Sequence, residues 1–315
     1  MKTVELRGRE IASGLRFPEG PVALADGSIL VVEIAAGRLT RISPTGKMSV
    51  VANLGGGPNG AAIGPDGACY VCNNGGFTWI ERADGLLRPT LKAPDYSGGR
   101  IERIDLRSGR VERLYDTCNG INLRGPNDLV FDKKGGFWFT DLGKVHERHI
   151  DRGAILYAQA DGSYITEPIF PITTPNGVGL SPDEGTVYAA ETEGARLWSF
   201  PVTEPGKVKL EPWPSPNGGR LRYTRPSYCR FDSLAIEADG NVCVATLIDG
   251  GITVISPQGE AIEFWATTDP YCTNICFGGP QFRTAYITLS GFGSLIAVDW
   301  PRQGLQSNFV DLVAG

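Results

Sequence analysis

The segment PNGVGLSPDEGTVYAAE at residues 175–191 decides the fold, because its order of apolar strand, short turn and second apolar strand recurs along the chain. The other copies are PEGPVALADGSILVVEI (18–34), PNGAAIGPDGACYVCNN (58–74), PNDLVFDKKGGFWFTDL (126–142), FDSLAIEADGNVCVATL (231–247) and TNICFGGPQFRTAYITL (273–289). Further strand–turn–strand units, such as GRLTRISPTGKMSVVANL, follow the first five copies. Four strands per repeat, six times, predict an all-β, six-bladed β-propeller with four-stranded antiparallel blades.

The sixth repeat has only one further clear strand, GSLIAVDW at 293–300. The N-terminal stretch VELRGREIA at 4–12 precedes the first repeat, and we expect it to supply the missing outer strand. This closure would join the two ends of the chain and protect a sheet edge. We expect residues 1–315 to form one propeller domain, in which the tail after Pro301 has no predicted place.

The composition of the chain limits its partners. The net charge is −5, with 30 Lys and Arg against 35 Asp and Glu, and no basic run could follow a phosphate backbone. Nucleic acid is therefore not an expected partner. The N-terminus lacks the apolar core of a signal peptide, and no uncharged apolar run reaches membrane-spanning length. We expect a cytoplasmic protein without a membrane partner, while the sequence leaves its oligomeric state open.

The cysteines and histidines argue against several kinds of site. Seven cysteines at scattered positions do not resemble a secreted disulfide framework. Cys69 and Cys72 fall in a strand pattern in which residues three apart point to opposite faces, so we interpret the cysteines as buried thiols. The two histidines, His146 and His149, leave little room for a histidine-built zinc site, and we interpret them as surface residues. No G-x-S-x-G elbow of a serine hydrolase is present.

Each repeat carries an oxygen-bearing side chain where its innermost strand begins. In a propeller these six equivalent positions surround the central channel at one end. Asn-Gly pairs are common in turns, so a single such residue would carry little weight, but turn chemistry does not predict six of them in one register. Such a set, without His or Cys, suits Ca²⁺, with Zn²⁺, Mg²⁺ or Mn²⁺ as alternatives. The six are Glu19, Asn59, Asn127, Asn176, Asp232 and Asn274.

Loop lengths indicate the same end of the channel. The turns inside the hairpins are short, whereas the long connections 75–99, 142–152 and 212–230 are expected on the face of the six residues. Functional loops often gather on one face of a rigid scaffold, so these loops are expected to form the walls of a pocket. Phe77 and Trp79 in the first loop are candidate substrate contacts, although aromatic residues also commonly pin long loops to a propeller.

Four motifs resemble the SMP-30/gluconolactonase family, which includes luciferin-regenerating and organophosphate-hydrolysing relatives and is built of six-bladed propellers. The resemblance covers nearly the whole chain. The motifs, in the family's order, are FPEGPV (17–22), GPNDLVFDKKGGFWFTD (125–141), TPNGVGLSPDEGTVYAAET (174–192) and FDSLAIEADGNVCVAT (231–246).

The resemblance implies metal ligands at four of the six positions, namely Glu19, Asn127, Asn176 and Asp232. Asn59 and Asn274 are not usual ligands of the family, so we assign them to substrate or water contacts. Asn127 is also expected to contact substrate. The chain departs from the gluconolactonase R-x-N-D pattern, because Gly125 occupies the position of the substrate-binding arginine and Arg124 lies one residue earlier. The sequences of the motifs resemble more closely those of bacterial lactonases with varied substrates.

These features together predict a metal-dependent hydrolase that opens a small lactone. Asp232 is the expected general base, and Asn127 and Asn176 would orient the carbonyl. Direct attack by a carboxylate on the substrate remains an alternative. Two other functions are also open: phosphotriester hydrolysis at the same ion, and a non-catalytic propeller that serves as a binding platform.

Overall fold

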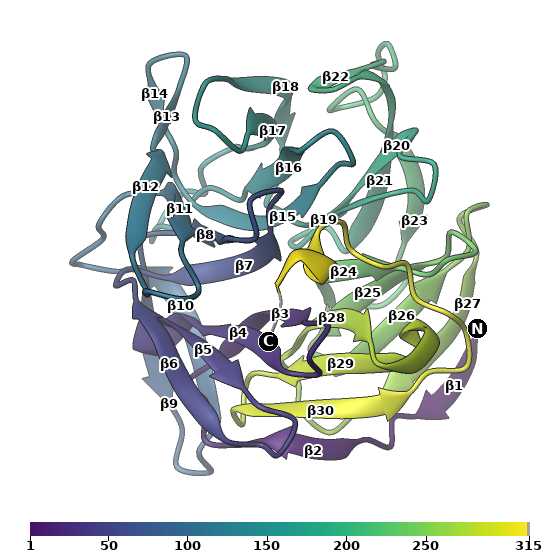
Figure 1. Ribbon diagram of the computed structural model, residues 1–315. Helices are drawn as coiled ribbons and strands as arrows, with labels where there is room; N and C mark the ends of the chain where they lie inside the picture. The colour runs from purple at the N-terminus through teal and green to yellow at the C-terminus, as the bar shows by residue number, and fades with distance from the viewer. Residues whose placement is uncertain (314–315) are drawn as a thin grey trace.

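Six small antiparallel sheets surround a central axis in a computed structural model that describes residues 1–313 (Figure 1). The innermost strands contact one another around the whole circle, from β3 through β7, β15, β19, β24 and β28 back to β3. The chain is therefore a six-bladed β-propeller, as the repeats predict. No helix in this part of the chain is long and apolar enough to cross a membrane.

The first three blades follow one pattern, in which four strands run from the axis outward. Blade one contains β3 (Pro18–Ala23), β4 (Ile29–Glu33), β5 (Arg38–Ile42) and β6 (Met48–Asn53). Blade two contains β7 (Pro58–Ile63), β8 (Cys69–Asn73), β11 (Arg100–Ile104) and β12 (Val111–Tyr115). Blade three contains β15 (Pro126–Phe131), β16 (Gly136–Asp141), β17 (Gly153–Gln159) and β18 (Ile165–Ile172).

The last three blades repeat this order with additions. Blade four contains β19 (Pro175–Leu180), β20 (Thr186–Glu191), β21 (Arg196–Glu204) and β23 (Arg220–Thr224), with the short β22 (Lys207–Val208) also paired to β21. Blade five contains β24 (Arg230–Ile236), β25 (Val242–Leu247), β26 (Gly251–Ile255) and β27 (Ala261–Ala266). Blade six contains β28 (Cys272–Gly278), β29 (Thr284–Leu289) and β30 (Ser294–Asp299).

Smaller elements lie between the blades. Two hairpins are inserted, β9 (Phe77–Glu81) with β10 (Leu87–Lys92) and β13 (Thr117–Cys118) with β14 (Ile121–Asn122). Three single-turn 3₁₀ helices are η1 (Ile34–Ala36), η2 (Pro280–Phe282) and η3 (Val310–Leu312).

The N-terminus closes the ring, which confirms the prediction from the incomplete sixth repeat. Strand β2 (Arg9–Ala12) pairs antiparallel with β30 and becomes the outer strand of blade six. The preceding β1 (Lys2–Glu5) pairs parallel with β27, so blade five gains a fifth strand that the repeat pattern does not predict. The first dozen residues therefore join two neighbouring blades and cover two sheet edges.

The prediction that 212–230 is one long connection between blades four and five was wrong. Residues 220–224 form β23, the outer strand of blade four, which pairs with β21. Only 225–229 then lead into blade five. The segment before β23 joins the third and fourth strands of blade four, so strand order no longer assigns it to the face of the six oxygen-bearing residues.

Buried apolar side chains form six clusters, one between each pair of neighbouring blades. Cys69 lies in the cluster between blades one and two, whereas Cys72 lies in the cluster between blades two and three. This arrangement confirms that residues three apart on this strand face opposite sides. All seven cysteines are free thiols, and only Cys276 is more than slightly exposed.

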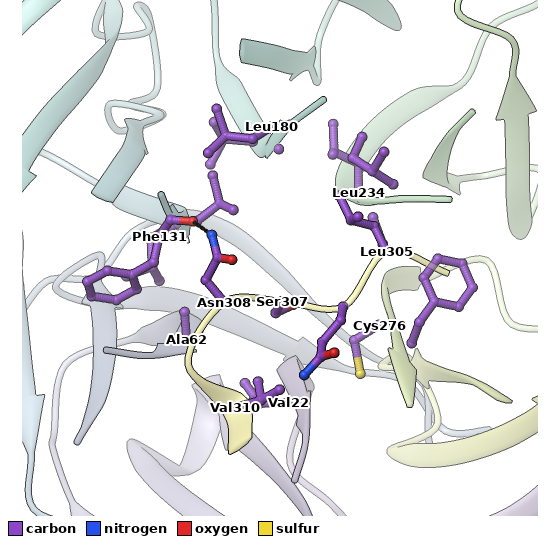
Figure 2. A pocket seen from close by; sticks show the side chains of 18 of the residues that line it. Val22, Ala62, Phe131, Leu180, Leu234, Cys276, Leu305, Ser307, Asn308 and Val310 are labelled. Carbon is purple, nitrogen blue, oxygen red and sulfur yellow. Dashed lines mark hydrogen bonds between the residues drawn. The ribbon is translucent and has the colours of Figure 1, made fainter. Parts of the chain in front are cut away.

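The C-terminal tail crosses the axis at one end of the channel (Figure 1). The Leu305 amide donates to the Ile236 carbonyl of blade five at 2.8 Å. The Asn308 side chain donates to the Phe131 carbonyl of blade three at 2.9 Å, and Val310 is buried in the cluster between blades one and two. Between the tail and the inner strands lies a cavity of about 150 Å³ that is partly open to solvent (Figure 2). The tail thus covers the end of the channel opposite the start of the innermost strands.

Candidate active site

Every blade interrupts its strand pairing at the position of the oxygen-bearing residue. The ladder between the innermost and second strands shifts register at 19–22, 58–61, 126–129, 175–178, 231–234 and 272–274. Bulges of this kind bend a strand and redirect its side chains, and they are common beside active sites. Six equivalent irregularities therefore lie at one end of the channel, where the sequence predicts a site.

The six oxygen-bearing residues are buried but not sealed from solvent. Their exposed fractions run from 2% for Glu19 to 9% for Asp232. Four Asn residues, at 59, 127, 176 and 274, lie between these values. The structure thus places all six in equivalent positions at the start of β3, β7, β15, β19, β24 and β28.

Two buried oxygens at this end of the channel have no hydrogen-bond partner among the described residues. They are Oε1 of Glu19 and Oδ1 of Asn127. The other carboxylate oxygen of Glu19 accepts a hydrogen bond of 2.6 Å from the side chain of Asn274. Buried polar atoms are rarely left without a partner, so these oxygens indicate a ligand. An oxygen-only set of carboxylates and amides fits a hard divalent cation such as Ca²⁺.

The carboxyl groups of this region repel one another. Burial, followed by the charge of Asp232, raises the pKa of Glu19 well above its usual range. Burial raises the pKa of Asp232 to about 7, and the Asn176 amide opposes that shift. The charge of Arg230, whose guanidinium pairs with Glu193 at 3.0 Å, also opposes the raised pKa of Asp232. The protein's side chains do not fully neutralise the charge of Glu19 and Asp232. A bound cation would do so and would keep both carboxylates ionised.

Asp128 is a third carboxyl group of the site, and the sequence analysis missed it. It is 7% exposed, and burial raises its pKa to about 7. Its charge acts on both Glu19 and Asp232. Asp128 follows Asn127 at a position where three other blades have glycine, namely Gly20, Gly60 and Gly177. A comparison of this position across the repeats would have identified it.

The glycines at this position allow neighbouring innermost strands to approach closely. A Cβ at Gly60 would lie 2.6 Å from the Asn127 carbonyl, and one at Gly177 would lie 2.8 Å from the Asp232 carbonyl. At Gly20, where φ is +50°, a Cβ would lie 2.6 Å from the Asn59 carbonyl. At these three positions a side chain would collide with the neighbouring strand's backbone, so glycine allows the innermost strands of blades one, two and four to approach the next blade closely.

The loop 75–99 folds back over the end of the ring where the innermost strands start. Its β9–β10 hairpin contacts blade one through Trp79, whose ring lies 5.1 Å from that of Phe17. The Leu87 amide donates at 2.8 Å to the carbonyl of Gly291, between the second and third strands of blade six. Both contacts lie at the end of the channel that holds Glu19. The sequence predicted this loop's place but not its own hairpin.

The loops of blades two and three are joined through Lys144. Its ammonium group lies 4.0 Å from the centre of the Phe77 ring and donates to the Asn74 carbonyl at 2.8 Å. Burial lowers the pKa of Lys144 to about 7. The Lys92 amide donates to the Val145 carbonyl at 2.9 Å as a second link. Phe77 and the loop 142–152 therefore form one connected wall.

Arg124 contributes its backbone rather than its side chain to the contacts in this structure. Its amide and that of Gly125 both donate at 2.7 Å to the buried carboxylate of Asp141. The Arg124 carbonyl accepts a hydrogen bond of 2.6 Å from the Tyr96 hydroxyl. The residue as a whole is exposed, which leaves its guanidinium free to contact a ligand.

The family model of the SMP-30/gluconolactonase/LRE-like region matches residues 17–291 of the chain. The chain belongs to this family. Lactonase drp35 of Staphylococcus haemolyticus is 28% identical over 246 residues, covering 78% of this chain and 67% of that protein. Lactonase drp35 of Staphylococcus aureus strain RF122 is 28% identical over 243 residues, covering 75% and 65%. The chain thus spans about two thirds of the length of these curated relatives, which are named lactonases.

Solved structures of family members share the fold. A calcium-binding protein, regucalcin from Agrobacterium tumefaciens, superposes with a TM-score of 0.77 at 16% identity and covers 98% of both chains. A gluconolactonase from Xanthomonas campestris superposes with a TM-score of 0.71 at 20% identity, covering 92% of this chain and 88% of its own. At these identities the likeness establishes the propeller, and the chemistry must be argued from the residues of the site.

Proposed function

We propose that the chain is a lactonase that hydrolyses a small cyclic ester at one divalent cation, Ca²⁺, on the propeller axis. The observation that carries the proposal is the pair of buried oxygens, on Glu19 and Asn127, that have no hydrogen-bond partner within residues 1–313 and lie beside mutually repelling carboxyl groups. Glu19, Asn127, Asn176 and Asp232 would hold the ion. When bound, a divalent cation supplies a Lewis acid that polarises a carbonyl oxygen.

Asp232 is the proposed general base. At 9% it is the most exposed of the six oxygen-bearing residues, which favours it as the group that contacts the attacking water. Its carboxylate would take a proton from that water as the water oxygen attacks the carbonyl carbon. The ester C–O bond then breaks, and the leaving alkoxide takes up a proton as the ring opens. Asn176, which opposes the raised pKa of Asp232, is placed to keep this carboxylate oriented.

The remaining residues of the site have supporting roles in this proposal. Asn274 donates to Glu19, so we assign it to orienting that carboxylate in addition to any contact with substrate or water. Asn59 and the Arg124 guanidinium are the proposed polar contacts of substrate. Phe77 and Trp79, in the hairpin that covers this face, would form the apolar wall.

Lactone hydrolysis is favoured over phosphotriester hydrolysis because the curated relatives are named lactonases. Parallel assays with a panel of lactones and a panel of organophosphates test this choice. We expect a higher calcium-dependent kcat/KM for a lactone, and Asp232→Asn should abolish most of it. A higher value for an organophosphate would replace the proposed reaction, and no turnover of either panel with calcium bound would favour a binding platform.

A further inference from the structure

A small hairpin within the loop 142–152 holds both histidines of the chain. Val145 and Ile150 form an isolated antiparallel bridge, and the His146 amide donates to the His149 carbonyl at 2.9 Å. Lys144 and Asp151 close the base, where the Asp151 amide donates to the Lys144 carbonyl at 3.0 Å. The buried Lys144 side chain anchors this hairpin to blade two, so its backbone is fixed although it lies at the surface.

The side chains of this hairpin bring three metal-binding groups together. The rings of His146 and His149 stack with centroids 4.1 Å apart and an interplanar angle of 11°. The Nε2 atom of His146 lies 3.4 Å from a carboxylate oxygen of Asp151. One ligand atom from each of the three residues lies within 4.8 Å of the others. His146 and Asp151 are both about a quarter exposed, with side-chain values of 23% each, so an ion can enter from solvent.

The donors differ from those on the propeller axis. Two imidazoles and one carboxylate suit a borderline transition metal, whereas the oxygen-only set of the axis suits Ca²⁺. Three protein ligands with an open fourth position are typical of zinc sites that keep a water molecule. Zn–N bonds are about 2.0–2.1 Å long, so the two rings must tilt out of their parallel stack toward a common point. Side-chain rotation suffices for this change because the backbone bridge is already formed.

We propose that His146, His149 and Asp151 form a second cation site that binds Zn²⁺ and leaves one coordination position to solvent. This site goes beyond the proposed lactonase function and does not depend on it. The cysteines compete only weakly with this site for Zn²⁺, because six of the seven are buried and burial raises the pKa of Cys276 to about 12. The only histidines of the chain lie at the site, so any histidine signal reports on it alone.

Nitrogen NMR of histidine-labelled full-length protein tests the proposal. The axial site is first saturated with Ca²⁺, and Zn²⁺ is then added. We expect both imidazole rings to shift together and to saturate at one Zn²⁺ per chain, with no shift on further Ca²⁺. Rings that do not respond to stoichiometric Zn²⁺ would overturn the proposal.

Calorimetry with matched variants checks the ligands. His149→Ala and Asp151→Asn should each weaken Zn²⁺ binding by at least about tenfold. Glu147→Gln, which removes an exposed charge from the same hairpin, should leave the affinity unchanged. Equal affinity in all variants, or equal loss in the Glu147 control, would contradict the three-residue site. Circular dichroism of each variant verifies that the fold is intact.

Discussion

Asn274 and Glu19, which lie 255 positions apart in the sequence, are joined by a side-chain hydrogen bond of 2.6 Å across the seam between blade six and blade one. The bond fixes one carboxylate oxygen of Glu19, while the other is buried and has no hydrogen-bond partner in the part of the chain that the structure describes. Closure of the ring and formation of the candidate site are therefore the same structural event.

Asp232→Asn should separate a ligand role from a base role. Asparagine keeps an oxygen and the shape of the side chain but cannot accept the proton. At saturating Ca²⁺ we expect kcat for the best lactone to fall about a hundredfold or more, in line with general-base contributions. Asp239→Asn, at an exposed position of the same blade, is the matched control. Recovery of wild-type kcat at high Ca²⁺ would reduce Asp232 to a ligand only.

The metal-free protein should lose stability as the pH rises from about 4 to about 7. Folding raises the pKa of Asp128 and of Asp232 to about 7, compared with about 4 in the unfolded chain. In this interval the folded state binds more protons than the unfolded state, so the free energy of unfolding falls with pH. Ca²⁺ should therefore raise Tm more at pH 8 than at pH 5. Calorimetric scans with an identical calcium effect at both pH values would argue against the axial site.

Much of the site followed from the sequence because a propeller repeats one register. Once the six copies of the repeat are aligned, six side chains converge without any knowledge of the blades' detailed packing. Asp128 was not predicted because its importance appears only when it is compared with the glycines at the same position of three other blades. The outer strand β23 was also not predicted, because it follows a Pro- and Gly-rich stretch whose sequence is typical of a continuous loop.

The tail was the other part of the fold that the sequence did not place. It has no strand periodicity. It contacts blade five, blade three and the apolar cluster between blades one and two. Such contacts depend on the closed ring, so no local pattern encodes them. The same holds for the parallel pairing of β1, which requires blade five to lie beside the N-terminus.

Val310→Ala should show that the tail stabilises the ring. Val310 is 5% exposed between blades one and two, and its truncation should cost about 1–3 kcal/mol of unfolding free energy. Leu312→Ala, in the same tail but 53% exposed, should change stability little. Urea denaturation measures both. Equal effects of the two substitutions would mean that the tail is not held as the structure shows.

Phe77→Ala should alter the ranking of substrates. Phe77 lies under the ammonium group of Lys144 in the wall formed by the two long loops. Losing this ring from an apolar wall should change the ratio of kcat/KM between a small and a large lactone by about tenfold or more. Ile80→Ala, at a 42% exposed position of the same hairpin, should leave the ratio unchanged. An unchanged ratio in both variants would make the hairpin a purely structural connector.

Titration of Ca²⁺ into chelator-treated protein, with lactone hydrolysis assayed at each point, tests the central claim most directly. We expect one ion per chain at the axis, activity proportional to its occupancy, and Ca²⁺ affinity at least about tenfold weaker in Glu19→Gln, because one of the neutralising carboxylates is lost. Glu10→Gln, on the exposed outer strand of blade six, should titrate as the wild type does. Full lactonase activity without metal, or unchanged Ca²⁺ affinity in Glu19→Gln, would contradict the account.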